Sequence, residues 1–162
     1  MRPGAGLPDM PELGLLLVTD PAFRNLRWYG DGPEESYVDR RAGARLGVWD
    51  ADVRTSLTPY LRPQEAGSRT GVRWATVTDE QGAGVRLESD QGMELSALPW
   101  TPFEIENAAH HTELPPVYQT VLRPALQRRG VGGDDSWGAR TLPEYRLPTV
   151  GTLRFRFGFT GV

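Results

Sequence analysis

The chain has 162 residues, a formal net charge of −3 and no cysteine, so it has the length of one domain and excludes a disulfide framework and thiol chemistry. Glycine (19) and proline (14) make up about a fifth of the chain, against roughly an eighth in average proteins, which indicates many turns and argues against a helical bundle. All 18 basic residues are arginines, but the acidic residues outnumber them at 21, so the basic surface of a nucleic-acid-binding protein is not expected.

The first third of the chain predicts two strands separated by turns. Residues 1–11 contain three prolines and two glycines and are expected to form a flexible lead. Residues 13–18 are a short apolar run, which predicts a strand buried on both faces and is far too short to cross a membrane. Residues 26–30 predict a second strand, ended by a Gly-Asp-Gly-Pro turn. Residues 34–56 show no strict period and predict a loop with a short helix.

The remaining two thirds predict more strands. They are expected at residues 72–78, 84–88, 93–98 and 117–122, with turn signals at 79–82 and 90–92. Near the C-terminus, Leu153, Phe155, Phe157 and Phe159 alternate with arginine and glycine, which is typical of a half-buried antiparallel strand. Short strands joined by turns predict a mainly β protein, an antiparallel β-sandwich, with one domain over residues 12–162.

The most informative segment is residues 129–138, which read Arg-Gly-Val-Gly-Gly-Asp-Asp-Ser-Trp-Gly. Glycines that tolerate positive φ and short polar side chains that bond to nearby backbone predict a tight loop, braced by Gly132, Gly133, Asp134, Asp135 and Ser136. Such a loop would present Trp137 as a flat platform for the apolar face of a sugar ring. The alternative is that Trp137 anchors the core.

This segment resembles the Gly-Gly-Asp-Asp-Ser-Trp motif near the C-terminus of the lac-type β-galactosidases, glycoside hydrolase family two. Residues 25–40 resemble a second family block, with matches at Trp28, Gly30, Gly32, Pro33, Glu34, Tyr37, Asp39 and Arg40. Residues 58–67, 70–74 and 110–114 continue the resemblance, which covers residues 7–159. One departure is Glu12, because the family often has arginine there in a Leu-Pro-Arg-x-Gly motif.

The resemblance implies a fold, an activity and a distribution of the functional residues among domains. The fold would be the C-terminal half of a β-supersandwich similar to galactose mutarotases. The activity would be hydrolysis of terminal β-D-galactosides such as lactose, with Trp137 stacking on the substrate. The catalytic glutamates, with magnesium and sodium, would lie on other domains, so no catalytic residue, metal site or cofactor is expected in this chain.

The partners implied are a galactoside and the remainder of a β-galactosidase chain or a large subunit. A half-sandwich would expose strand edges, so self-association is also expected. Neither nucleic acid nor a membrane is an expected partner, and the cytoplasm is the expected location. The sequence leaves open whether the rest of the enzyme is a separate subunit.

Two other functions remain open. The first is a free carbohydrate-binding module that uses Trp137. The second is a mutarotase-like epimerase with His110 as acid or base. Adjacent His110 and His111 would point apart on a strand, so they are not expected to share a metal. Glu104 and Glu106 would share a strand face about 6.6 Å apart, but a solvated face is the favoured interpretation over a catalytic pair.

The other aromatic residues are expected to be structural. The remaining tryptophans are predicted to be core or interdomain anchors: Trp28, Trp49, Trp74 and Trp100. The hydroxyls of Tyr37 and Tyr60 are expected to bond to backbone groups near their turns. Glu34 and Glu35 are expected to be turn residues or to form ion pairs, with Arg40 as the partner.

Overall fold

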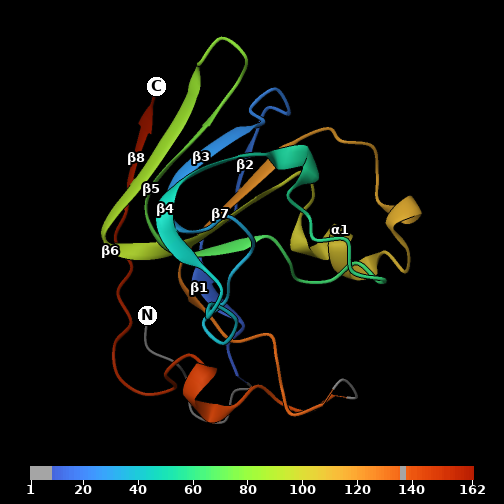
Figure 1. Cartoon of the computed structure of the whole chain (residues 1–162), viewed down its shortest axis with the longest axis vertical. Coiled ribbons are helices and arrows are strands. Elements are labelled where there is room, and N and C mark those ends of the chain that lie inside the picture. Colours follow the sequence, from blue (N-terminus) through green and yellow to red (C-terminus); the bar gives the residue numbers. More distant parts are fainter. Residues whose placement is uncertain (1–8, 136–137) are drawn as a thin grey trace.

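The computed structural model describes residues 9–135 and 138–162, which are mainly β (Figure 1). The strands are β1 (Glu12–Gly14), β2 (Leu17–Thr19), β3 (Asn25–Gly32), β4 (Arg45–Asp52), β5 (Ser68–Thr78), β6 (Gly84–Leu98), β7 (Thr120–Arg128) and β8 (Gly158–Gly161). The short helices are α1 (Pro102–Asn107) and the 3₁₀ turns η1 (Val53–Thr55), η2 (His111–Glu113) and η3 (Pro143–Tyr145). Most of the lead expected at residues 1–11 lies outside the described residues.

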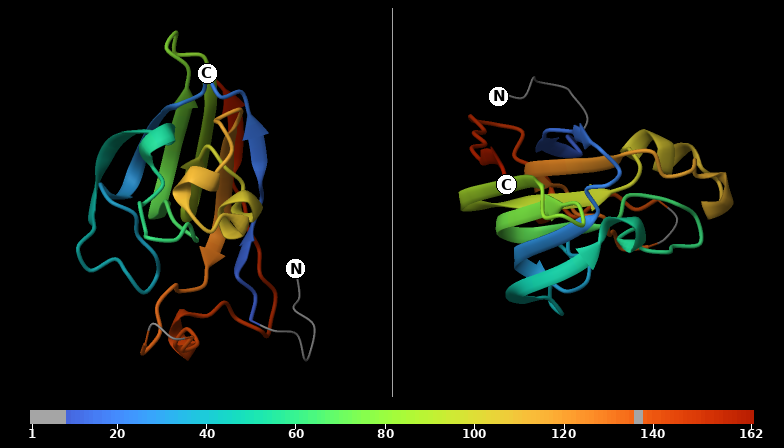
Figure 2. Two further views of the ribbon diagram at one scale, coloured as in Figure 1. Left: turned by 90° about the vertical axis from the view of Figure 1, so that its right-hand side faces the viewer. Right: turned by 90° about the horizontal axis from the view of Figure 1, so that it is seen from above.

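The eight strands form one antiparallel sheet in the order β1-β7-β6-β5-β3-β4, with β2 also on β7 and β8 also on β6. The long strand β6 organises it, because Val85–Glu88 pair with β8 while Glu94–Leu98 pair with β7. The sheet is bent rather than flat (Figure 2). This mainly β, antiparallel architecture is consistent with the expected β-sandwich.

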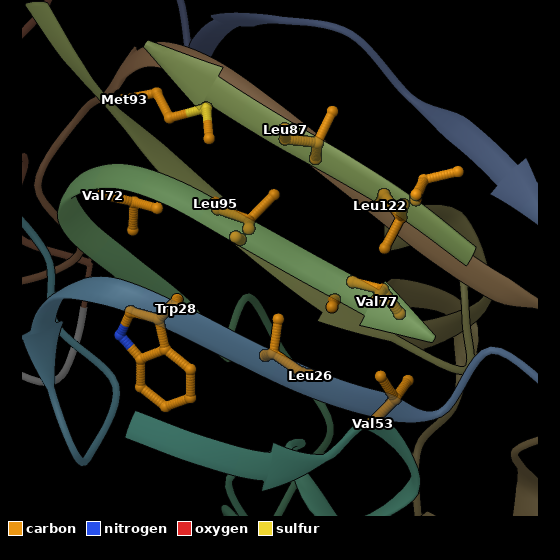
Figure 3. Packing of buried hydrophobic residues seen from close by; sticks show 12 residues of the cluster. Leu26, Trp28, Val53, Val72, Val77, Leu87, Met93, Leu95 and Leu122 are labelled. Atoms are coloured by element: carbon orange, nitrogen blue, oxygen red, sulfur yellow. The ribbon is translucent and has the colours of Figure 1, made fainter. Parts of the chain in front are cut away.

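The core lies on one face of β3, β5, β6 and β7 (Figure 3). Alternate residues of a strand point to the same face, so the apolar residues of these strands meet there. The cluster contains Leu26, Trp28, Val53, Val72, Ala75, Val77, Val85, Leu87, Met93, Leu95, Ala97 and Leu122. Phe155 and Phe157 pack against it, with their ring centroids 5.0 Å apart.

Strands lie where they were predicted at residues 26–30, 72–78, 84–88 and 93–98, and the one expected at 117–122 begins at Thr120, but the turn expected at residues 90–92 is absent. Strand β6 runs unbroken from Gly84 to Leu98. The pairs Trp74↔Glu88 and Val72↔Met93 enclose more residues on β6 than on β5, so β6 bulges there. Gly92 has a φ of 78°, a conformation that glycine adopts without strain. The turn-like composition therefore marks a bulge.

The strand expected at residues 13–18 is not buried on both faces. It divides into β1 and β2, which both pair with β7. Leu15, Leu16 and Val18 are each about half exposed. These residues lie at the outer edge of the sheet, so the described chain covers only part of their surface.

Strand β4 was missed by sequence reasoning. Its outward residues Leu46 and Val48 are exposed, whereas Trp49 and Ala51 pack against the core. Because both faces carry apolar residues, the sequence shows no alternation there. The short helix expected in the same region is the 3₁₀ turn η1.

The C-terminal strand is shorter than predicted. Only Gly158–Gly161 form a ladder, with β6. Leu153, Phe155 and Phe157 keep the expected alternation of burial, but Phe159 is 53% exposed. Among the helices of the described residues, none has the length and apolar character needed to cross a bilayer.

Candidate functional site

The segment that carries the predicted sugar-binding loop leaves the sheet at the end of β7 and passes below it before returning as β8 (Figure 1). We call residues 130–141 the Gly-Asp loop. Its two ends are joined, because Thr141 Oγ1 donates a hydrogen bond to the Gly130 carbonyl at 2.8 Å. The Gly130 amide donates to the Tyr145 carbonyl at 2.8 Å, and Arg146 Nε donates to the Thr141 carbonyl at 2.6 Å.

The predicted platform, Trp137, and its neighbour Ser136 lie outside the described residues. On the described part of the loop, positive φ occurs at Gly138 (109°) and not at Gly132 or Gly133. Gly133 is needed for a different reason, because a Cβ there would lie 2.6 Å from the Ala139 carbonyl oxygen.

The two predicted bracing aspartates lie differently. Asp135 Oδ1 accepts a hydrogen bond from the Ala139 amide at 3.2 Å, which connects the outgoing and returning arms of the loop. Asp134 is exposed. The described arms of the loop are therefore connected by one aspartate and by a close backbone approach at Gly133.

The Gly-Asp loop also contacts the connection between β3 and β4. The Gly132 amide donates to Asp39 Oδ2 at 2.7 Å, across 93 residues of sequence. A Cβ at Gly130 would lie 2.6 Å from the same carboxylate. Sequence reasoning had placed Asp39 on the family pattern without giving it a role, because nothing local relates it to the loop.

A pocket of about 770 Å³ lies beside the Gly-Asp loop. The loop supplies one wall, and the other walls come from the N-terminal segment, the 64–65 region, α1 and β7. Its charged lining residues carry both signs: Asp9, Glu12, Glu65, Glu106, Arg123, Arg128, Arg129 and Arg140. Side chains of this kind can bond to the hydroxyls of a polar ligand.

Two buried arginines of β7 line this pocket. Arg123 contacts Glu12 at 2.6 Å and Glu65 at 3.0 Å. Arg128 contacts Glu12 at 2.9 Å and donates to Ser68 Oγ at 3.0 Å. Glu12, which stands where the family often has arginine, therefore lies between two guanidinium groups, and an arginine there would face two like charges.

Glu94 of β6 is a buried carboxylate beside Arg128. It is 6% exposed, and its Oε2 accepts from the Arg128 amide at 3.1 Å. Burial raises the pKa of Glu94 to about 7, although the charge of Arg128 opposes that rise. We call Glu12, Glu65, Glu94, Arg123 and Arg128 the charged cluster.

Glu104 and Glu106 do not share a strand face, so that prediction was wrong. Both lie in helix α1. Thr101 caps the helix, since the Glu104 amide donates to Thr101 Oγ1 at 3.2 Å and the Thr101 amide donates to Glu104 Oε2 at 2.7 Å. The Thr-x-x-Glu pattern of a capping box was the signal that sequence reasoning overlooked.

The histidines lie at the 3₁₀ turn η2 rather than on a strand. His110 Nδ1 is 2.8 Å from Glu113 Oε1 and its side chain is 74% exposed. His111 Nε2 is 2.5 Å from the Tyr60 carbonyl oxygen. The two rings have different partners, and neither lines the loop pocket. Within residues 9–135 and 138–162, no three acidic or histidine side chains converge as a metal site requires.

Both tyrosine hydroxyls bond to carboxylates, and that of Tyr37 also has the expected backbone hydrogen bond, at Ser68. Tyr37 donates to Glu65 at 3.2 Å, and Tyr60 donates to Glu35. Glu35 also pairs with Arg40 at 3.3 Å, as expected. These bonds join the segment between β3 and β4 to residues 60–65.

The four other tryptophans differ in environment. Trp28 is buried in the core, and Trp49 packs against it. Trp100 Nε1 donates to the Pro115 carbonyl at 2.8 Å. Trp74 is half-buried, with the Arg86 guanidinium 5.0 Å from its ring centroid.

Comparison with known proteins decides the family. A family model described as beta galactosidase small chain matches residues 2–160. The chain belongs to the β-galactosidase small chain family. It is 46% identical over 147 residues to a β-galactosidase of Priestia megaterium, covering 91% of this chain and 14% of that protein. It is 42% identical over 160 residues to a β-galactosidase of Halalkalibacterium halodurans, covering 98% of this chain and 16% of that protein.

A third relative is named as a subunit. The chain is 36% identical over 165 residues to a β-galactosidase small subunit of Latilactobacillus sakei, covering 94% of this chain and 51% of that subunit. The chain thus spans about half of that small subunit and about a seventh of the two longer relatives.

Proposed function

We propose that this chain is the C-terminal domain or a subunit of a β-galactosidase that hydrolyses terminal β-D-galactosides such as lactose. The observation that carries the proposal is the family match over residues 2–160. Within this assembly the Gly-Asp loop would present Trp137 to the sugar. The joined ends of that loop and its contact with Asp39 support a presenting role.

The chain's own contribution is binding and orientation. Retaining glycoside hydrolysis needs two carboxylates about 5–5.5 Å apart, and we place these, with the magnesium and sodium sites, on the other domains. The chain by itself is therefore expected to be inactive. Glu104, which the sequence offered as one of a possible catalytic pair, instead caps helix α1. The cytoplasmic location stays a prediction.

The partner would be the remainder of the enzyme, in the same chain or as a large subunit. Apolar side chains at both edges of the sheet support a partner: Leu15, Leu16 and Val18 beside β7, and Leu46 and Val48 on β4. Val48→Asp should weaken assembly, measured by sedimentation of the chain with the rest of the enzyme. Self-association of the chain is the competing outcome, and it would appear as a dimer when the chain is sedimented alone.

The central test is a complementation assay with a nitrophenyl galactoside. The chain, a β-galactosidase body that lacks this region, and their mixture are assayed separately. Activity in the mixture alone supports the proposal. Activity of the chain alone would overturn it and return attention to His110. If the mixture is inactive and the folded chain binds galactose at millimolar concentration, the chain is a free carbohydrate-binding module.

The role of Trp137 is tested in the active mixture. Stacking on an aromatic ring contributes on the order of 1 kcal/mol, so Trp137→Ala should raise KM about five- to tenfold and leave kcat within about twofold. Trp74→Ala is the matched control, because Trp74 is a half-buried indole on the sheet. A KM that does not change in Trp137→Ala would refute the stacking role.

A further inference from the structure

The β3–β4 connection holds one carboxylate against the Gly-Asp loop. Asp39 lies in the turn formed by residues 37–40, which is closed by a 2.9 Å hydrogen bond from the Arg40 amide to the Tyr37 carbonyl. Tyr37 is 1% exposed and bonds to Glu65. Arg40 bonds to Glu35 and to the Tyr60 hydroxyl. The turn is thus fixed on both sides of Asp39.

The contact between Asp39 and the loop is close and directional. The 2.7 Å bond from the Gly132 amide is charge-assisted, and such bonds are roughly twice as strong as neutral ones. A Cβ at Gly130 would lie 2.6 Å from the Asp39 carboxylate, and one at Gly132 would lie 3.2 Å from Asp39 Oδ2. Glycine at position 130 is therefore what allows the backbone to approach this carboxylate.

The other bonds at the base of the loop are of a different kind. Thr141, Tyr145 and Arg146 all belong to the segment after β7, so the bonds among them fix the shape of that segment. Arg146 also pairs with Asp9 at 3.5 Å, which joins the base of the loop to the N-terminal segment. The bond from Gly132 instead reaches a turn between β3 and β4, which is separate in sequence and held by buried Tyr37.

We propose that Asp39 is a positioning residue, whose carboxylate sets where the Gly-Asp loop lies and so where Trp137 meets the sugar. The inference rests on the function proposed above. A displacement of about 1 Å in a group that orients substrate is costly for an enzyme. Loss of Asp39 should thus weaken substrate binding without contact between Asp39 and the substrate.

The first test uses the chain alone and does not depend on sugar binding. In Asp39→Ala, amide hydrogen exchange at Gly132 should become about tenfold faster, because its acceptor is gone. Asp39→Asn keeps an acceptor oxygen and should restore most of the protection. Glu34→Ala, an exposed change in the same connection, is the control and should leave Gly132 unaffected. Unchanged exchange in Asp39→Ala would overturn the proposal.

The second test uses the assembled, active enzyme. Asp39→Ala should raise KM for a nitrophenyl galactoside about fivefold, with kcat within about twofold, and Asp39→Asn should be milder. In a Trp137→Ala background, Asp39→Ala should add less than about twofold, since two residues that act through one contact are not additive. A full additional fivefold rise would show that Asp39 does not act through Trp137.

The two tests separate the two proposals. If Trp137→Ala leaves KM unchanged, the function proposed for the loop fails, whereas exchange at Gly132 still decides whether Asp39 holds the loop. If Asp39→Ala does not fold, both measurements are made on Asp39→Asn, with Glu34→Ala as the control. Because Asp39→Asn keeps the acceptor, its KM and Gly132 exchange should match those of the control, and adding Gly130→Ala should raise both. Values that do not rise on adding Gly130→Ala would overturn the proposal.

Discussion

The apolar core and the charged cluster lie on opposite faces of the same strands. Met93 and Leu95 of β6 belong to the core, whereas Glu94 between them belongs to the charged cluster. All three are less than a tenth exposed, so both faces of this strand are buried at these positions. The difference lies in how each face is satisfied. The core needs only apolar contact, while the charged cluster needs partners with matched charge and geometry.

The energetics of the two faces differ accordingly. Burying an apolar side chain stabilises roughly in proportion to its area. A buried ion pair gains little net stability over apolar residues of the same size, but the loss of one partner is strongly destabilising. Arg128 depends on several partners at once, because these come from three strands, β1, β5 and β6.

The largest effect is expected in the core. Trp28→Ala should lower the free energy of unfolding by about 3–5 kcal/mol, since Trp28 is 1% exposed and its Nε1 donates to the Asp31 carbonyl at 2.9 Å. Urea unfolding measures the loss, with Trp74→Ala as the control that should cost much less. A loss below about 1.5 kcal/mol would contradict the packing described for Trp28.

The next effect separates the charged cluster from the core. Arg128→Met should cost about 3 kcal/mol at pH 8, because it leaves Glu94 buried and without its cation. Replacing both partners, Arg128→Met with Glu94→Leu, should recover most of that loss. If the double variant is no more stable than Arg128→Met, then the penalty does not come from an uncompensated charge.

A third effect concerns pH. The pKa of Glu94 is raised from 4.5 to about 7 in the folded chain, so between these values the folded state binds more protons than the unfolded state. The contribution of Glu94 to stability is therefore full below about pH 4.5 and is lost as the pH rises through about 7, with a total on the order of 3 kcal/mol. Glu94→Gln should remove this slope, and thermal unfolding from pH 5 to 8 measures it. An equal slope in both proteins would assign it to another group.

The smallest effect is expected at a surface ion pair. Arg27 and Asp50 approach to 3.8 Å with side chains 59% and 67% exposed. Asp50→Ala should change the free energy of unfolding by less than about 0.5 kcal/mol. A loss as large as that of Arg128→Met would mean that the distinction between buried and exposed pairs does not hold in this protein.

Local pattern was sufficient for the strands with one apolar face. Strands were predicted within β3 and β5, and both halves of β6 were predicted as separate strands, because the strand signals are visible within a few residues. Strand β4 was missed because Leu46 and Val48 are exposed on one face while Trp49 and Ala51 pack against the core on the other, and the period disappears when both faces are apolar. Helix α1 was missed although its Thr101–Glu104 capping box is a local signal.

For the candidate site, the sequence pointed to the Gly-Asp loop but not to its supports. The resemblance singled out Trp137, which no described contact tests. The carboxylate that holds the loop, Asp39, is 93 residues from Gly132, and Glu12 is 116 residues from Arg128. No local rule relates residues so far apart.

The sequence by itself determined the mainly β fold, the family and the position of a glycine-rich loop in the chain, because these depend on periodicity and on short motifs. The tertiary structure decided which residues meet. It placed Asp39 against Gly132, Glu12 between Arg123 and Arg128, and Glu94 in a buried site. Hydrogen bonds and ion pairs depend on distances of a few ångströms between segments that only folding brings together.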